Sequence, residues 1–570
     1  MNTYTCIYPQ NDKDVSTAEN KTALSYAVAN IAWKNDRVVA FGQSFVDLTP
    51  VASSIATIDI TTAIPMAEQH AVGTHTGHPT DLEYLMKPDG HLALAHVIQV
   101  QNEDAGARHE VFIDAHTGEL LLLNDLWEQY TVLPIPGDEV PPNGFKTLTD
   151  PADTTASPSG WHTVKTSSTT TTAGNNCMVF KWDYEGSTTE QSSATLNFNY
   201  AFDASKEPTE DVNLNAARVN AFYVANTFHD FTYRYGFTED AFNFQEYNFN
   251  RGGKEGDRVL VHVQFANRKN TSSFWSPADG QNGDCRLYVI SPKRDPSFDN
   301  GIIIHELTHG LTHRMTGGGT ATEWARSLGT AEAAGLGEGW SDAMADWVAQ
   351  SSAPIKDYVH AAYATGKAQG NRECPYSTSE DTNPFRYWNV WEYMTKDEER
   401  VHHIGPIWAN ILHNIHAALV EKYGFSTSAM TNPDGTEGNI MFLHLFIDAL
   451  ALQPAQPTFL WARQAWLQAD YNRYNGANQA LLWNVFASRG LGVDATADYE
   501  DGLLVPSHSK AIIIERPETK LPPIKGWPDL CPVASGCIVS ISVLPQTVVT
   551  IFGVSIRTPF SRPLSDINFF

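Results

Sequence analysis

Two histidines and a glutamate in the stretch 305–309 have the types and the spacing that hold and use a metal ion. His305 and His309 are four positions apart, so on a helix both project from one face. Two neutral imidazoles placed in this way can bind one zinc ion at about 2.0–2.1 Å. Glu306 stands beside the first histidine, where its carboxylate can act on a metal-bound water. The pattern predicts hydrolytic zinc chemistry, and the alternative is a buried helix that carries these residues by chance.

A hydrolytic zinc site needs a third protein ligand and keeps a fourth position for water. Glu338 supplies a candidate in a second motif, Gly335–Asp342, which reads Gly-Leu-Gly-Glu-Gly-Trp-Ser-Asp. Asp342 follows one helical turn later, where it can accept the free ring N–H of a ligand histidine. Glu332 is the competing third ligand because it is nearer in sequence. We favour Glu338, because it alone has an aspartate one turn further on.

Residue positions exclude two other zinc sites: a metzincin site and a site that includes His313. A metzincin would need glycine at position 312 and histidine at position 315, where the chain has Thr312 and Met315. His313 continues the spacing of four, but about 12 Å of helix axis separate it from His305, too far for one ion. We therefore expect His313 to be a partly exposed helix residue.

Helices and short strands are expected to position these side chains. Apolar residues at helical spacing predict a helix that starts at Asp299 or Asn300, carries both histidines and ends near Gly317–Gly319. Short β-like runs separated by turns fill Met178 to Ile290, apart from a helical pattern over Asn213–Tyr235. Further helices are predicted over Glu332–Gln350, His402–Lys422, Asn439–Leu452, Thr458–Tyr471 and Ala477–Ser488.

Residues 1 to about 126 form a separate small α+β unit by the same criteria. Helical spacing of apolar residues covers Thr22–Trp33, and strand-like runs cover Leu92–Val100 and His109–Ala115. Residues 134–143 are rich in proline and glycine, which predicts a linker to the rest of the chain.

Composition argues against some classes of partner. The chain has 570 residues, enough for about three or four domains, and a net charge of −27. We expect no nucleic-acid or anionic-membrane partner, because phosphates require Lys and Arg. The six cysteines are scattered and form neither a Cys-x-x-Cys zinc site nor a dense disulfide framework.

The two ends of the chain need separate interpretation. Residues 1–10 are polar, with no charged start followed by an apolar run, so they do not predict a signal peptide. The apolar run Cys537–Ile556 is long enough to span a bilayer, but Pro545 and Gln546 weaken that interpretation. We expect residues 516–570 to be an extension of the gene model rather than a membrane anchor.

The two metal-binding motifs, His305–Gly318 and Gly337–Asp342, resemble those of the fungalysin family of secreted fungal metalloproteases, relatives of thermolysin. The resemblance runs from about Tyr130 to about Ala497 and includes the blocks Ala156–His162, Tyr235–Glu239, Asn243–Gln245, Pro277–Gly280 and Phe486–Gly492. One segment departs from the family: Asn270–Ser273 reads Asn-Thr-Ser-Ser, where the family has Asn-Asn-Ala-Asn in an edge strand thought to hold the substrate backbone. Backbone bonds could survive this change.

The resemblance implies an α+β fold, that of a two-lobed, thermolysin-like metalloprotease. Residues 127–300 would be its β-rich N-terminal lobe and residues 301–515 its helical C-terminal lobe. Residues 1–126 would be a propeptide-like domain that acts as chaperone and inhibitor, and a stable accessory domain is the alternative. The family is secreted through a signal peptide, so we expect an extracellular protein whose true start lies upstream of Met1.

The resemblance also implies a zinc-dependent endopeptidase, made as a zymogen, that hydrolyses internal peptide bonds of extracellular proteins. His305, His309 and Glu338 would bind Zn²⁺, and Glu306 would be the general base. His402 would stabilise the oxyanion, with His403 as its local competitor. Asp342 would orient His305.

Two rival functions share this scaffold. One is a non-catalytic, zinc-stabilised binding protein that cannot seat a substrate because of its altered edge strand. The other is a zinc aminopeptidase, which would cut only from free N-termini. The partners expected for the endopeptidase are protein or peptide substrates and its own propeptide, with no membrane and no nucleic acid.

Overall fold

The computed structural model describes residues 51–500 except 78–79, 88–90, 103–106, 126–127, 139, 166, 182–185, 194–195, 266–270, 290–293, 319–327 and 395–399. It also describes the backbone of residues 2–6, 23–24, 29–34, 37–43 and 503–506. Contacts divide the chain into two units, Met1–Ile513 and Ile514–Phe570. The second unit lies outside the described residues, and so does the apolar run Cys537–Ile556. Among the described residues, no helix combines the length and apolar character needed to cross a bilayer.

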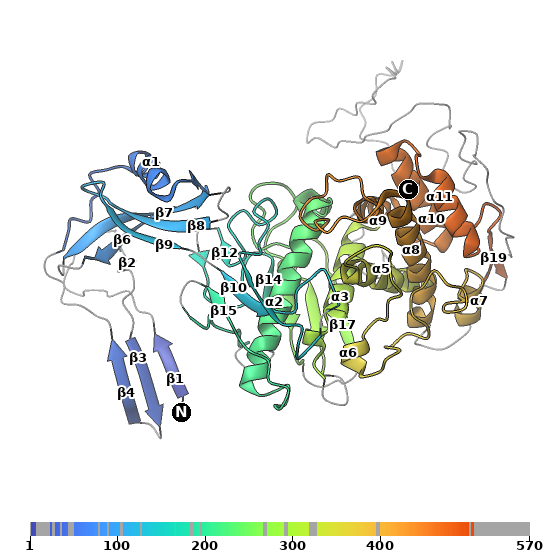
Figure 1. The fold of residues 1–570 in the computed structure, drawn as a ribbon, viewed down its shortest axis with the longest axis horizontal. Helices are drawn as coiled ribbons and strands as arrows, with labels where there is room; N and C mark the ends of the chain where they lie inside the picture. The colour runs from blue at the N-terminus through green and yellow to red at the C-terminus, as the bar shows by residue number, and fades with distance from the viewer. Residues whose placement is uncertain are drawn as a thin grey trace, which may run out of the picture. The chain divides into compact units, whose positions relative to one another are not determined.

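The N-terminal part consists mainly of strands (Figure 1). A three-stranded antiparallel sheet contains β1 (Asn2–Cys6), β3 (Ala29–Lys34) and β4 (Arg37–Gln43). A larger sheet has the order β2-β6-β7-β8-β9, and β5 pairs with β7. Its strands β2 and β5 to β9 span Ala23–Leu24, Thr74–His75, Asp81–Met86, Leu92–Asn102, Ala107–Asp114 and Leu120–Asp125. Helix α1 (Ile60–Ala71) buries its alanines against this sheet.

The structure confirms part of the prediction for this region. The strands predicted at Leu92–Val100 and His109–Ala115 are present as β7 and β8. The helix predicted over Thr22–Trp33 is wrong, because the described backbone there forms β2 and β3. A short apolar run fits helical and strand periods alike. Residues Ala29–Lys34 form a strand because β3 pairs with β1 on one side and with β4 on the other.

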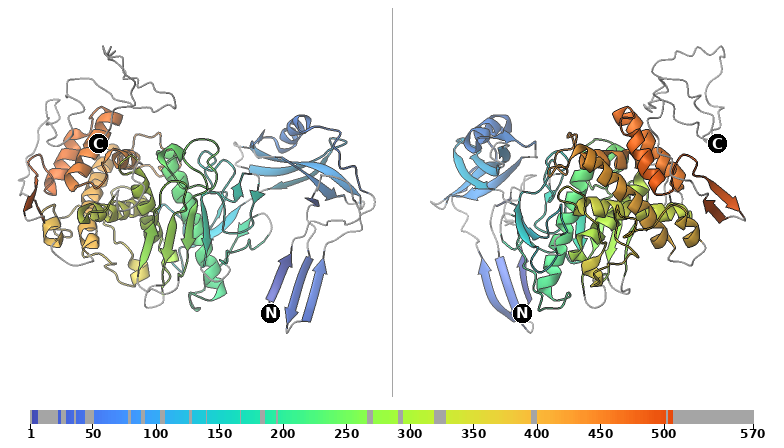
Figure 2. Two further views of the ribbon diagram at one scale, coloured as in Figure 1. Left: turned by 180° about the vertical axis from the view of Figure 1, so that it is seen from behind. Right: turned by 45° about the vertical axis from the view of Figure 1, so that its right-hand side comes forward.

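Two sheets of three or more strands and a long helix are the main elements of residues 129–299 (Figures 1 and 2). The first sheet has the order β11-β10-β15, spanning Lys146–Thr149, Gln129–Val132 and Asn197–Phe198. The second has the order β14-β16-β18-β17, spanning Cys177–Phe180, Val259–His262, Asp284–Leu287 and Ser272–Trp275, so β17 is an edge strand. The helix predicted over Asn213–Tyr235 is present as α2 (Asp211–Arg234), which lies against β10 and β14. Short elements complete the region: β12 (Thr163–Val164), β13 (Ser167–Ser168) and the 3-10 turns η1 (Glu239–Ala241) and η2 (Pro296–Phe298).

Residues 300–488 are mainly helical. The helix predicted to carry both histidines is α3, which spans Asn300–Met315 with Asp299 as its N-cap residue and ends just before Gly317. The five later helices predicted from periodicity are confirmed as α5, α8, α9, α10 and α11, over Ala331–Ala349, Val401–Tyr423, Gly438–Leu452, Phe459–Tyr474 and Gln479–Ser488. Two short helices were not predicted, α6 (Ala362–Thr365) and α7 (Asn389–Met394). A final hairpin pairs β19 (Ala497–Glu500) with β20 (Leu503–Pro506).

Helix α3 is enclosed on several sides, by β17 and β18 and by helices α2, α5 and α9. A methyl group at Gly310 would come within 2.8 Å of the Phe274 ring, so the absence of a side chain there lets β17 pack against α3. Arg314, in the last turn of α3, is buried and donates to the carbonyls of Phe242 and Pro277 and to the carboxylate of Asp257, each at 3.0 Å. This arginine ties the end of α3 to the segment that follows the edge strand.

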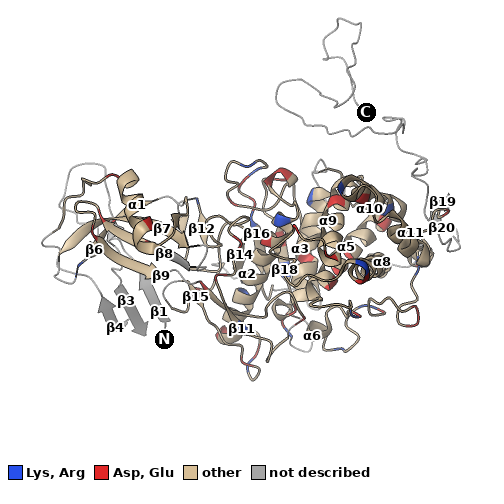
Figure 3. Cartoon of the chain, turned by 45° about the horizontal axis from the view of Figure 1, so that its top comes forward, with Lys and Arg blue, Asp and Glu red and all other residues tan. Residues whose placement is uncertain are grey.

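Taken as a whole, the architecture is a mixed α+β fold, as the sequence predicted at that level of detail. Figure 3 shows the acidic residues spread over many loops and helices of the described chain.

Candidate metal centre

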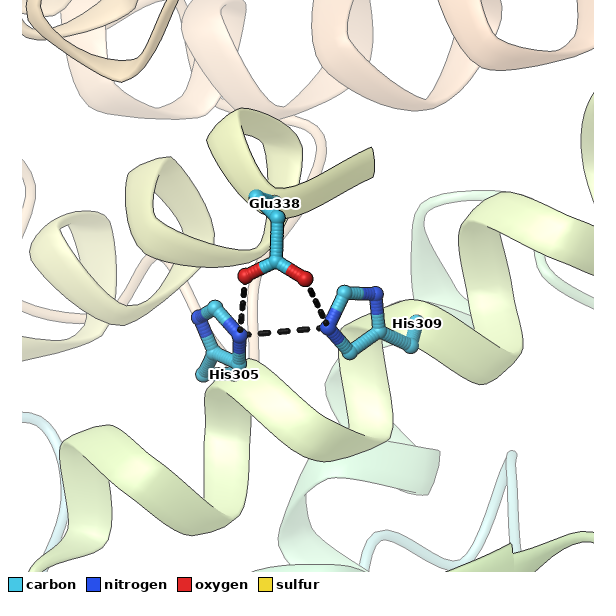
Figure 4. A group of neighbouring side chains, drawn as sticks. All are labelled: His305, His309 and Glu338. Carbon is cyan, nitrogen blue, oxygen red and sulfur yellow. Dashed lines mark hydrogen bonds and ion pairs between the residues drawn. The ribbon is translucent and has the colours of Figure 1, made fainter. Parts of the chain in front are cut away.

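Helices α3 and α5 bring the three predicted ligands together (Figure 4). The Nε2 atoms of His305 and His309 lie 3.1 Å apart. Glu338 approaches them with one oxygen each, at 3.3 Å from His305 and 3.5 Å from His309. A tetrahedral ion with bonds of about 2.0–2.1 Å separates its ligand atoms by about 3.4 Å. The three donors therefore fit one zinc ion in both chemistry and spacing.

Glycines allow α5, the helix that carries Glu338, to pack closely against α8. Helix α5 crosses α8, and a methyl group at Gly405 of α8 would lie 2.5 Å from the Cβ atom of Glu338. A methyl group at Gly339 would lie 2.5 Å from the carbonyl oxygen of Gly405. Any larger residue at these positions would push the two backbones apart. Gly339 of the motif 335–342 and Gly405 of α8 thus permit the close packing of the two helices.

Asp342 lies behind the histidine ligands and is completely buried. Its Oδ1 atom is 2.7 Å from Nδ1 of His305. Burial alone would raise the pKa of Asp342, but Arg372, His360 and His305 together outweigh burial and hold that pKa well below its usual range. An ionised Asp342 can only accept hydrogen bonds, so the proton stays on Nδ1 of His305 and Nε2 is free to bind a metal.

Glu306 is buried beside the ligands without joining them. Its Oε2 atom has no hydrogen-bond partner among the described residues. Burial raises the pKa of Glu306 to about 7, although His305 opposes that rise. A carboxylate with a pKa near neutrality can take up and release a proton at the pH of the reaction.

The two adjacent histidines at the start of α8 have different surroundings. His402 places Nε2 at 3.5 Å from Glu338, and its side chain is 53% exposed. His403 instead lies 2.7 Å, through Nδ1, from the carboxylate of Glu373. His402 is therefore the histidine that borders the three ligands.

Two other residues considered from the sequence lie elsewhere. Glu332 accepts a hydrogen bond from the backbone N–H of Phe459 at 2.8 Å, at the first turn of α10, and is not part of the ligand group. The prediction that His313 is partly exposed is wrong, because it is buried, with its ring 6.0 Å from that of His309. Enclosure of α3 on several sides buries a face that an ordinary surface helix would expose.

Three residues around Asp342 were missed by sequence reasoning: Arg372, Tyr376 and His360. Arg372 donates two hydrogen bonds to Asp342 and lies 3.7 Å from Oε2 of Glu338. His360 brings its Nε2 atom to 3.7 Å from Asp342. His305, Asp342 and His360 also bring metal-binding atoms within 4.8 Å of one another. The positive charge of Arg372 beside Asp342 disfavours a cation there.

A helix with two histidines four residues apart, a glutamate from the next helix and a buried carboxylate beside the first histidine together define the metal centre of a zinc metallopeptidase. The fungalysin metallopeptidase (M36) family model matches residues 129–495, which is more than half of the chain. The chain belongs to the fungalysin family of metallopeptidases, which are zinc enzymes.

Curated relatives agree with this assignment. The chain is 36% identical over 439 residues to "Extracellular metalloproteinase mep" of Aspergillus fumigatus, covering 74% of this chain and 67% of that protein. It is 39% identical over 363 residues to "Extracellular metalloproteinase MEP" of Pyricularia oryzae, and the match covers 61% of this chain and 56% of that protein. It is 34% identical over 431 residues to "Extracellular metalloproteinase 1" of Arthroderma gypseum, covering 73% and 66%.

Proposed function

We propose that this protein is a secreted zinc endopeptidase that hydrolyses internal peptide bonds of extracellular proteins. The observation that carries the proposal is the set of three side chains whose metal-binding atoms converge: the Nε2 atoms of His305 and His309 lie 3.1 Å apart, and one oxygen of Glu338 approaches each of them, at 3.3 and 3.5 Å. The Glu306 carboxylate is buried beside them. The names of the relatives, extracellular metalloproteinases, support secretion.

The roles of the side chains follow from their places in the site. His305, His309 and Glu338 hold the zinc ion, which supplies a Lewis acid that polarises the peptide carbonyl and acidifies the attacking water. Glu306 accepts the proton of that water and delivers it to the nitrogen of the leaving amine. His402 donates from Nε2 to the carbonyl oxygen as it becomes negative. Asp342 keeps the imidazole of His305 in the metal-binding tautomer.

We propose that the catalytic part of the chain consists of two lobes. Residues 127–300, with both sheets and α2, form the β-rich lobe, and residues 301–515 form the helical lobe. Residues 1–126 are proposed to be a propeptide that assists folding and inhibits the enzyme, which would make the full chain a zymogen. Among the described residues, the six-stranded sheet and helix α1 pack together in a folded unit of suitable size. Residues 516–570 are proposed to be an extension of the gene model and not part of the native protein.

An internally quenched peptide with a blocked N-terminus tests the endopeptidase directly. We expect cleavage that stops on addition of a chelator and returns with zinc. Cleavage restricted to peptides with a free N-terminus would identify an aminopeptidase instead. Zinc binding without cleavage of any peptide, casein or gelatin would identify a binding protein.

A further inference from the structure

Four hydrogen bonds from three residues converge on the carboxylate of Asp342. Oδ1 accepts from Nδ1 of His305 at 2.7 Å and from Nη2 of Arg372 at 3.0 Å. Oδ2 accepts from Nε of Arg372 at 2.7 Å and from the hydroxyl of Tyr376. A carboxylate has about four acceptor positions, so these bonds fill them and leave the group one orientation.

Tyr376 is itself held firmly behind the metal helix. Its backbone N–H donates to the carbonyl of Tyr358 at 2.8 Å, and its carbonyl accepts from Tyr358 at 3.0 Å. The two rings are stacked with centroids 6.3 Å apart, and Tyr376 is 1% exposed. Tyr358 in turn abuts the first turn of α3, since a methyl group at Gly301 would come within 2.5 Å of its hydroxyl. The Tyr376 hydroxyl therefore has a fixed position relative to α3.

We infer that Tyr376 is a positioning residue of the zinc site, which acts through Asp342 on the orientation of His305. The inference rests on the proposed zinc ligands. Arg372 alone leaves one acceptor position of Oδ2 empty, and the Tyr376 hydroxyl fills it. In a buried site of low dielectric constant, that bond restrains the carboxylate strongly, and the carboxylate restrains the imidazole. Tyr376 thus contributes to zinc affinity without touching the metal.

The test is the zinc dissociation constant of the Tyr376→Phe variant, measured by competition with a chelating dye. This change removes one oxygen and keeps the ring that stacks on Tyr358. We expect zinc to bind about tenfold more weakly, the lower end of the range for losing an outer partner of a ligand. The zinc-free variant should unfold at nearly the same temperature as zinc-free wild type. An unfolded zinc-free variant would show a structural role and overturn the inference.

The chain offers a matched control in Tyr393. Its hydroxyl donates to the carboxylate of Glu373 at 2.9 Å. That carboxylate is hydrogen-bonded to His403, which is not among the proposed zinc ligands. We expect Tyr393→Phe to leave zinc affinity unchanged. An equal loss of affinity in both variants would show that the effect is not specific to Asp342.

A double-mutant cycle checks that Tyr376 acts through Asp342. In an Asp342→Asn background, Tyr376→Phe should cause little further loss of zinc affinity. Losses that add in full would overturn the inference, as would an unchanged affinity in the single variant. In either case an active wild-type peptidase would leave the proposed function intact, whereas a wild-type protein that binds no zinc would overturn that function as well.

Discussion

The backbone of Gly405 lies so close to Glu338 that a single methyl group on the glycine would sit 2.5 Å from the Cβ atom of the glutamate. The contact sets how closely α5 can pack against α8. Because α5 carries Glu338 and α3 carries the two histidines, a shift of α5 would move the carboxylate relative to the histidines.

Gly405→Ala is predicted to separate α5 from α8. We expect a loss of about 1–3 kcal/mol in the free energy of unfolding, as for other overpacked cores, together with weaker zinc binding. Denaturant unfolding and zinc titration would measure both effects. Gly337→Ala is the matched comparison, because its methyl group would meet only the end of the Leu328 side chain, at 3.0 Å. Equal behaviour of the two variants would contradict the prediction.

Asp342→Asn is predicted to weaken zinc binding by about 10- to 100-fold, because the amide no longer enforces the metal-binding tautomer of His305. Asp346, one turn further along α5, is the control. It holds His413 through the same geometry, with Nδ1 and Oδ2 2.7 Å apart, but His413 is not a proposed ligand. Asp346→Asn should lower stability and leave zinc affinity unchanged when both are measured by unfolding and chelator competition.

Glu306→Gln is predicted to separate metal binding from catalysis. The amide cannot accept the proton of the attacking water, so we expect peptide cleavage to fall by about 10²–10⁴-fold. Zinc content, measured by elemental analysis after dialysis, should stay at the wild-type level because Glu306 is not among the ligands. Full activity of the variant would remove Glu306 from the mechanism.

Glu332 is predicted to make stability depend on pH, because burial raises its pKa to about 7. In the unfolded chain this pKa returns to its ordinary value, so the folded protein binds the proton more tightly. The stabilising effect of that proton is complete at low pH and is lost as pH rises through about 7.

Glu332→Gln keeps an acceptor for the Phe459 N–H but cannot ionise. The free energy of unfolding should therefore be measured at several pH values. Between about pH 5 and pH 8, that of the variant should rise relative to that of wild type, by up to about 3 kcal/mol. A constant difference across this range would mean that Glu332 does not titrate there.

Local periodicity was enough to predict the ligand helices. Both histidines lie within one turn, and Glu338 and Asp342 share one face of α5, so short-range spacing alone placed them. The main helices followed for the same reason. The choice between His402 and His403 needed the structure, because adjacent helix residues point about 100° apart and only the packing of α8 shows which one borders Glu338.

The partners of Asp342 could not be predicted because they come from an irregular segment. Arg372 and Tyr376 lie between α6 and α7, where no period marks an element, and the Tyr358–Tyr376 pairing brings the tyrosine back toward α3. Burial of His313 was missed for a related reason. The number of neighbours around α3 depends on distant parts of the chain, which a single helix does not reveal.

The bonds of Arg314 bear on how a bound peptide would meet the metal. Because this arginine donates to the carbonyls of Pro277 and Gln281, just beyond β17, its bonds hold the end of the strand at a fixed spacing from the last turn of the histidine-bearing helix. A chain laid along that strand would hold a constant distance from the ligands, and little orientational entropy would remain to be lost on reaching the transition state.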